Sequence, residues 1–470
     1  MSLWETYSAF ANCYGGVIIL GVKENHDGSW NMTGLENASK LKKDFWNAIN
    51  DKKKVSINLL MDKDVKVYEE NGKVILVIYV PRAKREQKPV YINGNIFDGT
   101  FRRNWEGDYH CDRSEVLAML RDQPEETADM KILEDMPLDV LHEETIHAYR
   151  NRHITFRREH VWERLEDNEY LERIGAAKIS AKDGKLHPTA AGLLMFGEEY
   201  KILYEFPEYF LDYREVLDPT IRWTDRLQSS SGDWTGNLFD FFFRVYGKLV
   251  KDLKIPFKLE GITRIDDTPV HKALREALAN CLVNTDFYFQ RGIVIRKDVN
   301  SITMENPGNI RTGKEQMLKG GISDPRNKAL MKMFNLIGIG ERAGSGVPDI
   351  YSVWKQQGWE PPEVIEEYGP DRTILKLSFV KSGDKKAAIK SGDKKAAIKS
   401  GDKNRAMKKT EKQMQEILEY MTPDKEYRTA EIATNMGIKN SRARELMKNL
   451  VKQGKIKAIG KNKGRRYIRK

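Results

Sequence analysis

The stretch HKALREALANCLVNTD, residues His271 to Asp286, decides the fold of the central part of the chain. Its apolar residues recur at helical spacing and predict a helix with one face in a core: Leu274, Ala277, Leu278, Cys281 and Leu282. Glu276, Asn280 and Asn284 are each four residues apart, so they line up along another face of the same helix. A carboxylate one turn from an amide can polarise a water and hold a cation beside phosphates. The alternative is the solvated face of an ordinary amphipathic helix.

Glycine-bearing segments downstream of this helix favour a nucleotide site. Strands are expected at 292–297 and 301–304, and the second leads directly into Glu305-Asn306-Pro307-Gly308. Gly344 and Gly346 follow in a turn, and a strand at 371–379 closes this part of the chain. Glycines let a backbone approach a base and expose N–H groups to phosphates. The ordered set therefore indicates that the polar helix face belongs to a nucleotide site.

This order resembles the GHKL ATP-binding fold over residues 190–380, in the divergent form found beside AlbA-type domains in bacterial transcriptional regulators. The resemblance implies an α/β sandwich with ATP and Mg²⁺ as cofactors. REALANCLVNTDF matches the family's N box, so Asn280 would be the Mg²⁺ ligand and Glu276 the general base if ATP is hydrolysed. Glu305 or Asn306 would replace the family's adenine-binding aspartate. The full set of implied nucleotide contacts is Asn280, Asn284, Glu305, Asn306, Gly308, Gly344 and Gly346. The alternative is a scaffold that retains the fold without ATP.

A second glycine-containing motif resembles a P-loop but departs from it at one key position. GNIRTGKE, residues 308–315, nearly fits the P-loop pattern, but Glu315 replaces the hydroxyl that would ligate Mg²⁺. A carboxylate at that position repels phosphates, and no acidic Walker B strand follows. Helicase activity is therefore not expected.

The N-terminal part carries a second resemblance. AFANCYGGVIILGV (9–22), IYVPRAKREQKPVY (78–91) and FRRNWEGDYHCDRSEVLAML (101–120) resemble the Schlafen/AlbA-type DNA-binding domain over residues 1–122. A helix end and a tight turn before a strand explain Asn12, Gly15 and Gly16 without any site. In Schlafen nucleases, part of the acidic metal-ligand set lies in an E…EFK segment that would precede Met1. DNA binding is thus expected here, with a Schlafen-like nuclease or ATPase acting in phage defence as the alternative.

Residues 123–189 predict a charged, helical connector. Helices are expected at 137–152 and 159–173, followed by a hairpin near 183–184. Thr189 is expected to cap a short buried helix that ends at Gly197. Strands at 211–213 and 220–223 and an aromatic-rich helix over 237–253 would follow.

The positive charge of the chain is concentrated at its end. The net charge is +11, but residues 381–470 hold 27 Lys and Arg against 10 Asp and Glu, a net of +17. SGDKKAAIK occurs at 382–390 and again at 391–399, which predicts a tether over 381–409 that buries no core. A domain of this charge indicates a nucleic-acid partner.

Residues 410–470 resemble a winged helix, with helices expected at 411–421, 430–436 and 441–453 and strands at 456–459 and 466–468. Ser441, Arg442 and Arg444 would start the recognition helix. Lys461, Lys463, Arg465 and Arg466 would lie on the wing, over phosphates. A helix-turn-helix without interleaved aromatics favours double-stranded DNA over RNA. The alternative is a winged helix that contacts protein.

Composition limits the remaining possibilities. Three cysteines without paired spacing predict neither disulfides nor a zinc site. No signal peptide and no run of about 18 apolar residues is found. We expect a cytoplasmic α+β multidomain protein without membrane partners, and by analogy with repressors and GHKL proteins a homodimer. Taken together, the sequence predicts an ATP-binding, DNA-binding transcriptional regulator.

Overall fold

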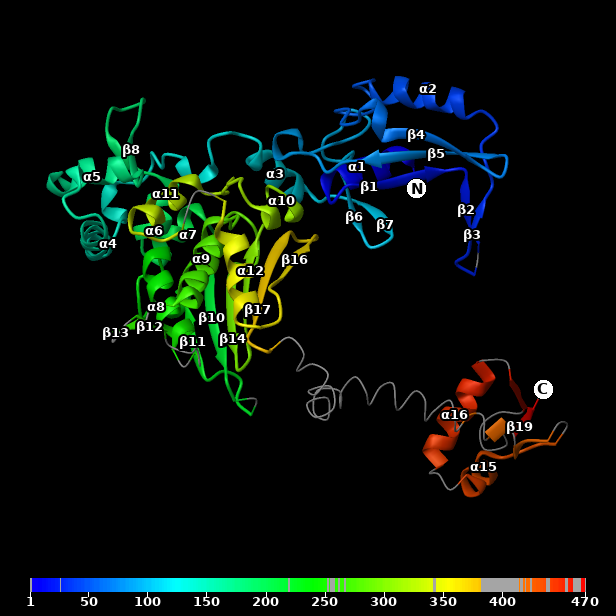
Figure 1. The fold of residues 1–470 in the computed structure, drawn as a ribbon. Coiled ribbons are helices and arrows are strands. Elements are labelled where there is room, and N and C mark those ends of the chain that lie inside the picture. Colours follow the sequence, from blue (N-terminus) through cyan, green and yellow to red (C-terminus); the bar gives the residue numbers. More distant parts are fainter. Residues whose placement is uncertain are drawn as a thin grey trace. The chain divides into compact units, whose positions relative to one another are not determined.

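The computed structural model contains two compact units, Met1–Val380 and Lys381–Lys470. It describes residues 2–25, 27–218, 220–251, 253, 268–340, 344–381, 414, 417–418, 420–422, 425–436, 440–452, 455–459 and 466–469, and the backbone of 258–260 and 263–265. Side chains at 440–442 and 452 are outside this description. Helices and several separate sheets alternate along the chain (Figure 1), which confirms the α+β multidomain class. Within the described part, none of the helices combines the length and the apolar character needed to cross a membrane.

The N-terminal part is built around a three-stranded antiparallel sheet of order β1-β5-β4 and two further hairpins. Its elements are α1 (Leu3–Asn12), β1 (Gly16–Leu20), β2 (Val22–Glu24), β3 (Trp30–Met32), α2 (Ala38–Ile49), β4 (Val65–Glu70), β5 (Lys73–Val80), β6 (Phe101–Asn104), β7 (Gly107–His110) and α3 (Arg113–Asp122). Asn12 is buried, and its side chain bonds the backbone of Val90 and of Phe101. Gly15 has φ +76°, and a Cβ there would lie 2.8 Å from Val80 O. These contacts give Asn12 and Gly15 of the AFANCYGG segment a structural role.

Residues 123–189 share one hydrophobic core with residues 190–380. Tyr149 and Tyr170 of the predicted connector pack in the same cluster as Phe196, Phe242 and Leu278. The boundary expected at 189/190 therefore does not separate two cores. The elements of this segment are α4 (Glu143–Phe156), α5 (Asp167–Ile174), β8 (Ala177–Ile179), β9 (Leu186–Pro188) and α6 (Ala190–Phe196).

The two helices predicted in this segment begin later than expected. Leu138–Val140 is a single 3₁₀ turn, and Leu141 then pairs with Gly197 in a β-bridge before α4 begins. A residue paired in a bridge cannot continue a helix, so the expected helix at 137–152 was wrong at its start. The helix expected at 159–173 is likewise a 3₁₀ turn at Val161–Arg164 followed by α5.

The central sheet has six strands in the order β11-β10-β14-β15-β17-β16. The strands are β10 (Leu211–Val216), β11 (Asp225–Gln228), β14 (Ile293–Asp298), β15 (Ser301–Pro307), β16 (Glu363–Glu367) and β17 (Arg372–Ser378). Only the β10–β14 pair is parallel. The strand expected at 220–223 was wrong, because the Asp218 carboxylate accepts the N–H and O–H of Thr220 and forms a turn there.

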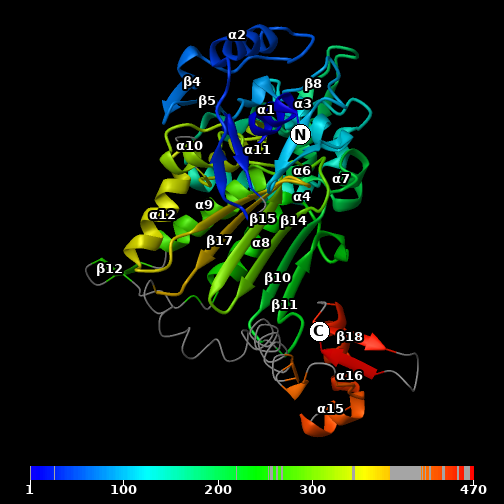
Figure 2. The ribbon, with the colours of Figure 1, turned by 90° about the vertical axis from the view of Figure 1, so that its right-hand side faces the viewer.

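The helices α8 (Leu238–Val250), α9 (Pro269–Val283) and α12 (Gly346–Gln356) lie along one face of this sheet (Figures 1 and 2). The neighbouring helices are α7 (Glu199–Glu205), α10 (Lys314–Lys319) and α11 (Lys328–Leu336), and β12 (Lys258–Glu260) and β13 (Thr263–Ile265) form a small hairpin before α9. The predicted helix at the opening stretch is α9, and its apolar residues are buried as expected. This face of the sheet holds the candidate site.

The C-terminal unit has its own small core. Ile432, Leu446, Met447, Leu450 and Tyr467 are buried in it. Its named elements are α15 (Thr429–Asn435), α16 (Asn440–Lys452), β18 (Ile456–Ile459) and β19 (Arg466–Arg469), close to the predicted positions. The repeats at 382–399 lie outside the described residues, and the winged-helix assignment stays a prediction.

Candidate nucleotide site

A cavity of about 150 Å³ lies between α9 and the central sheet. Among the residues predicted to contact a nucleotide, Glu276, Asn280, Asn284, Asn306, Gly344 and Gly346 line it. Two of the predicted residues, Glu305 and Gly308, do not. The structure thus brings together six of the eight residues named from the sequence.

The polar row on α9 has the predicted geometry. Asn280 Nδ2 donates to Glu276 Oε1 over 3.1 Å, and both side chains are half-buried. Asn284 is the residue just after the helix, and its Nδ2 donates to the Asn280 carbonyl over 2.9 Å. Its Oδ1 accepts the Arg326 N–H over 3.4 Å. The Asn284 amide therefore closes the end of α9 as well as lining the cavity.

Two glycines bring the start of α12 up to this row. A Cβ on Gly346 would lie 2.0 Å from Glu276 Oε1, so only glycine allows this approach. Gly344 has φ +69°, and a Cβ there would lie 2.8 Å from the backbone of Ile322. The Glu276 carboxylate thus lies at the N-terminus of an 11-residue helix, where exposed N–H groups favour negative charge. Residues 341–343 of the predicted glycine turn lie outside the described residues.

The sequence left open whether Glu305 or Asn306, at the end of β15, takes the place of the adenine-binding aspartate. Successive side chains of a strand point to opposite faces of a sheet. Asn306 faces the cavity and is buried, whereas Glu305 pairs with Arg372 Nε over 3.0 Å. Glu305 lines a separate concavity that contains Arg214 and Arg372 and none of the α9 polar row. Of the two candidates at the adenine position, Asn306 lines the cavity, and Glu305 does not, contrary to expectation.

Thr373 is a cavity residue that sequence reasoning missed. It lies on β17 directly opposite Asn306, and its hydroxyl donates to Gly308 O over 2.8 Å. The strand itself was predicted, but its register with β15 was not. A hydroxyl and a buried amide side by side provide both donor and acceptor groups for a base edge.

Gly308 and the P-loop-like motif have other roles. Gly308 has φ +98°, and a Cβ there would lie 3.0 Å from Arg326 Nη2. Lys314, the lysine of that motif, donates to the Val364 carbonyl over 2.6 Å. It therefore ties the start of α10 to β16.

The rest of the cavity wall is apolar. Met304, Ile310, Met331, Ile350 and Leu375 contribute to it. Burial raises the pKa of the Cys281 thiol to about 12, so this wall residue is neutral. An apolar slot with a few convergent polar groups is typical of sites for planar small molecules.

The predicted DNA-binding residues lie in the second unit. Arg444 is exposed on α16, and Arg466 on β19 pairs with Glu426 over 2.8 Å. Ser441 and Arg442 lie in α16, but only their backbone is described. Lys461, Lys463 and Arg465 lie outside the described residues.

Comparisons with known proteins identify four segments. Residues 1–111 match the family described as Schlafen, AlbA_2, and residues 291–373 match the family described as putative ATP-dependent DNA helicase recG C-terminal. The chain is a Schlafen/AlbA-type multidomain protein. In this Schlafen/AlbA-type chain, residues 117–212 match a domain of unknown function, DUF8451, and residues 413–467 match the family described as FaeA-like protein.

Two solved structures are similar to parts or all of the chain. The DIP2311 protein from Corynebacterium diphtheriae is 16% identical, covering 100% of this chain and 89% of its own, with a TM-score of 0.42. The N-terminal domain of a putative ATP-dependent DNA helicase RecG-related protein from Nitrosomonas europaea is 30% identical. That match covers 23% of this chain and 72% of the other, with a TM-score of 0.18. No curated protein matches the chain.

Proposed function

We propose that this protein binds ATP with Mg²⁺ in the α9 cavity and binds double-stranded DNA, as a transcriptional regulator whose nucleotide state modulates DNA binding. The observation that carries the proposal is the meeting of the Glu276–Asn280 pair with Gly346 in one cavity. The match of residues 291–373 to a family named for an ATP-dependent helicase supports the ATP part. The Schlafen/AlbA match and the +17 charge of residues 381–470 support the nucleic-acid part.

The donors of the cavity suit Mg²⁺ held mainly by a nucleotide. Mg²⁺ prefers oxygen ligands, and typically takes one or two from protein and the rest from phosphates and water. Asn280 directs its Nδ2 to Glu276, which leaves its Oδ1 as a ligand. Within the described residues no group of three His, Cys, Asp or Glu forms a metal site, so phosphates would supply the remaining ligands. The bound ion would neutralise phosphate charge.

The geometry favours ATP binding over ATP cleavage. Glu276 would be the general base, but its carboxylate already accepts from Asn280 and lies at the N-terminus of α12. The Oε1 atom is therefore occupied by Asn280 rather than directed toward an attacking water. Hydrolysis is therefore expected to be slow, and the protein acts chiefly as a nucleotide-dependent binder. By analogy with repressors and GHKL proteins, we also propose that the protein is a cytoplasmic homodimer.

Titration of a fluorescent ATP analogue in the presence of Mg²⁺ tests the cofactor. We expect Asn280→Ala to weaken binding by about tenfold or more, because it removes an oxygen contact to a charged ligand. Asn151→Ala, at an exposed position on α4, is the matched control and should bind as wild type does. Equal affinity of wild type and Asn280→Ala would refute the proposed site.

A further inference from the structure

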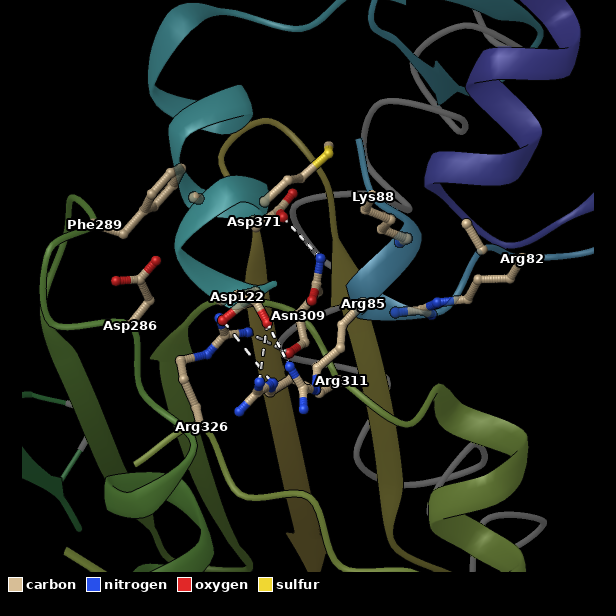
Figure 3. Close-up of a pocket in the computed structure, with 14 residues that line it drawn as sticks. Arg82, Arg85, Lys88, Asp122, Asp286, Phe289, Asn309, Arg311, Arg326 and Asp371 are labelled. Carbon is tan, nitrogen blue, oxygen red and sulfur yellow. Dashed lines mark hydrogen bonds and ion pairs between the residues drawn. The ribbon is translucent and has the colours of Figure 1, made fainter. Parts of the chain in front are cut away.

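A cluster of charged side chains lies where the N-terminal part meets residues 311–326, and Figure 3 shows its members Arg85, Asp122, Arg311 and Arg326. We call Arg85, Asp122, Arg311, Asp324 and Arg326 the junction cluster. Arg85 Nε donates to Asp324 Oδ2 over 2.8 Å, and Arg326 donates to the Asp122 carboxylate. Arg311 Nη2 donates to the Asp122 carbonyl over 3.1 Å. Residues of α3 and of the loop after β5 are thereby held against residues 311–326.

Two members of the cluster also line the nucleotide cavity. Arg311 and Asp324 belong to its wall, while Arg85, Asp122 and Arg326 do not. The Arg311 side chain is 3% exposed, and its Nε has no hydrogen-bond partner. The nearest carboxylate oxygens, on Asp324 and Asp122, are 3.7 Å and 3.9 Å away, too far for a hydrogen bond. Arg311 therefore reaches both sites and is incompletely paired.

This part of the rim adjoins the glycine turn expected to face phosphates. The N–H of Gly321 donates to the Gly344 carbonyl over 3.1 Å, and Gly344 packs against Ile322. Asp324 follows Ile322 by two residues. The junction cluster thus meets the cavity close to the start of α12.

We propose that Arg311 contacts the phosphates of a bound nucleotide, and that its recruitment loosens the junction cluster. This inference rests on the proposed function and describes how a bound nucleotide would change the contacts of the N-terminal part. An anionic phosphate chain attracts the guanidinium of Arg311 and repels the Asp324 carboxylate. Arg311 cannot keep its bonds to the Asp122 and Pro325 carbonyls while turning to phosphates. The end of α3 then loses one of its contacts, and Arg85, which also donates to the Asp122 carbonyl, and Arg326 still hold it. Arg82–Glu366 and Arg121–Asp286 hold the N-terminal part in place, so the change is local.

Hydrogen exchange of the full chain, with and without Mg²⁺-ATP, tests the loosening of the end of α3. We expect nucleotide to raise exchange about fivefold or more in peptides covering 113–124, a factor within the usual range of coupling between sites. Peptides of α8, which contacts neither the cavity nor the cluster, are the internal control.

If nucleotide binding loosens the junction cluster, then a substitution that loosens the cluster must change the nucleotide affinity, because coupling between two sites is reciprocal. Asp122→Ala removes the carboxylate that holds Arg326 and leaves the cavity wall unchanged, and we expect about fivefold tighter nucleotide binding. Arg311→Gln should weaken binding by a similar factor and abolish the nucleotide effect on exchange. Asp225→Ala, which breaks an ion pair with Lys248 away from both sites, should do neither.

The outcomes separate the two proposals. Nucleotide binding with unchanged exchange at 113–124, and with wild-type affinity in Asp122→Ala, overturns the regulatory inference and leaves the proposed function intact. If Asp122→Ala does not fold, the wild-type exchange and Arg311→Gln decide the matter. Absence of any nucleotide binding to the wild-type protein overturns both.

Discussion

At the scale of single residues, a Cβ on Gly346 would lie 2.0 Å from Oε1 of Glu276 and would force the two apart. We expect Gly346→Ala to push the start of α12 away from Glu276 and to reduce nucleotide affinity by about tenfold, since overpacking commonly costs about 1–3 kcal/mol. Measurement of affinity together with thermal unfolding checks this.

The control for that variant is another helical glycine. Gly247 lies inside α8, and a Cβ there would meet nothing within 4 Å. Gly247→Ala should stabilise the protein by about 0.5–1 kcal/mol, because alanine loses less conformational freedom in a helix. Similar behaviour of the two alanine variants would contradict the close approach of Gly346 to Glu276.

Asp371 gives stability a pH dependence. Burial first, and then the Glu115 charge, raise the pKa of its carboxyl from 3.8 to about 7. A raised folded-state pKa means that the carboxyl's contribution is complete below about pH 4 and is lost as pH rises through about 7. Asp371→Asn does not titrate, so its melting temperature should rise relative to wild type between pH 5 and pH 8.

The pKa of Lys88 lies close to that of Asp371, but the protonation of Lys88 changes stability in the opposite direction. Burial, and then the Arg82 charge, lower its pKa from 10.5 to about 8, so its contribution is lost as pH falls through about 8. Lys88 is present in both proteins, but its charge and that of Asp371 interact, so the melting difference reports on the Lys88–Asp371 pair. A melting difference that does not change with pH would show that the pKa of Asp371 is not raised.

At the scale of elements, α6 depends on its cap. All of its residues are buried, and the Thr189 hydroxyl oxygen accepts the Gly192 N–H over 3.0 Å while donating to Gly175 O over 2.8 Å. Thr189→Ala should cost about 1–2 kcal/mol in urea unfolding. Thr155→Ala, at an exposed position on α4, should change stability by less than about 0.5 kcal/mol. Equal costs would mean that the cap does not support α6.

The elements also show where local patterns suffice. The apolar periodicity correctly predicted α9, and the Thr189 cap correctly predicted α6. Both signals depend only on residues within one or two helical turns. The helix expected at 137–152 failed at its start because Leu141 pairs with Gly197, more than 50 residues away. A β-bridge between residues so far apart gives no signal in the sequence around Leu141.

At the scale of the whole molecule, the proposed function assigns nucleotide binding and DNA binding to different units. All residues that line the α9 cavity lie in Met1–Val380, so a chain ending at Val380 should keep wild-type nucleotide affinity. The same truncation should greatly reduce DNA affinity and its dependence on salt, since it removes the net charge of +17. Gel shifts at two salt concentrations measure this, and undiminished affinity would exclude residues 381–470 as the DNA-binding part.

The sequence by itself determined the charge division, the capped helices and the Glu276–Asn280 row, because these follow from composition and short-range spacing. Only the tertiary structure decided that Asn306 rather than Glu305 faces the cavity, that Thr373 stands opposite it, and that Arg311 joins the cavity to Asp122. The physical reason is that strand register and ion pairing depend on chain segments that meet only after folding. The stretch His271 to Asp286 therefore predicts a polar helix face, and residues of β15, β17 and α12 enclose a cavity against that face.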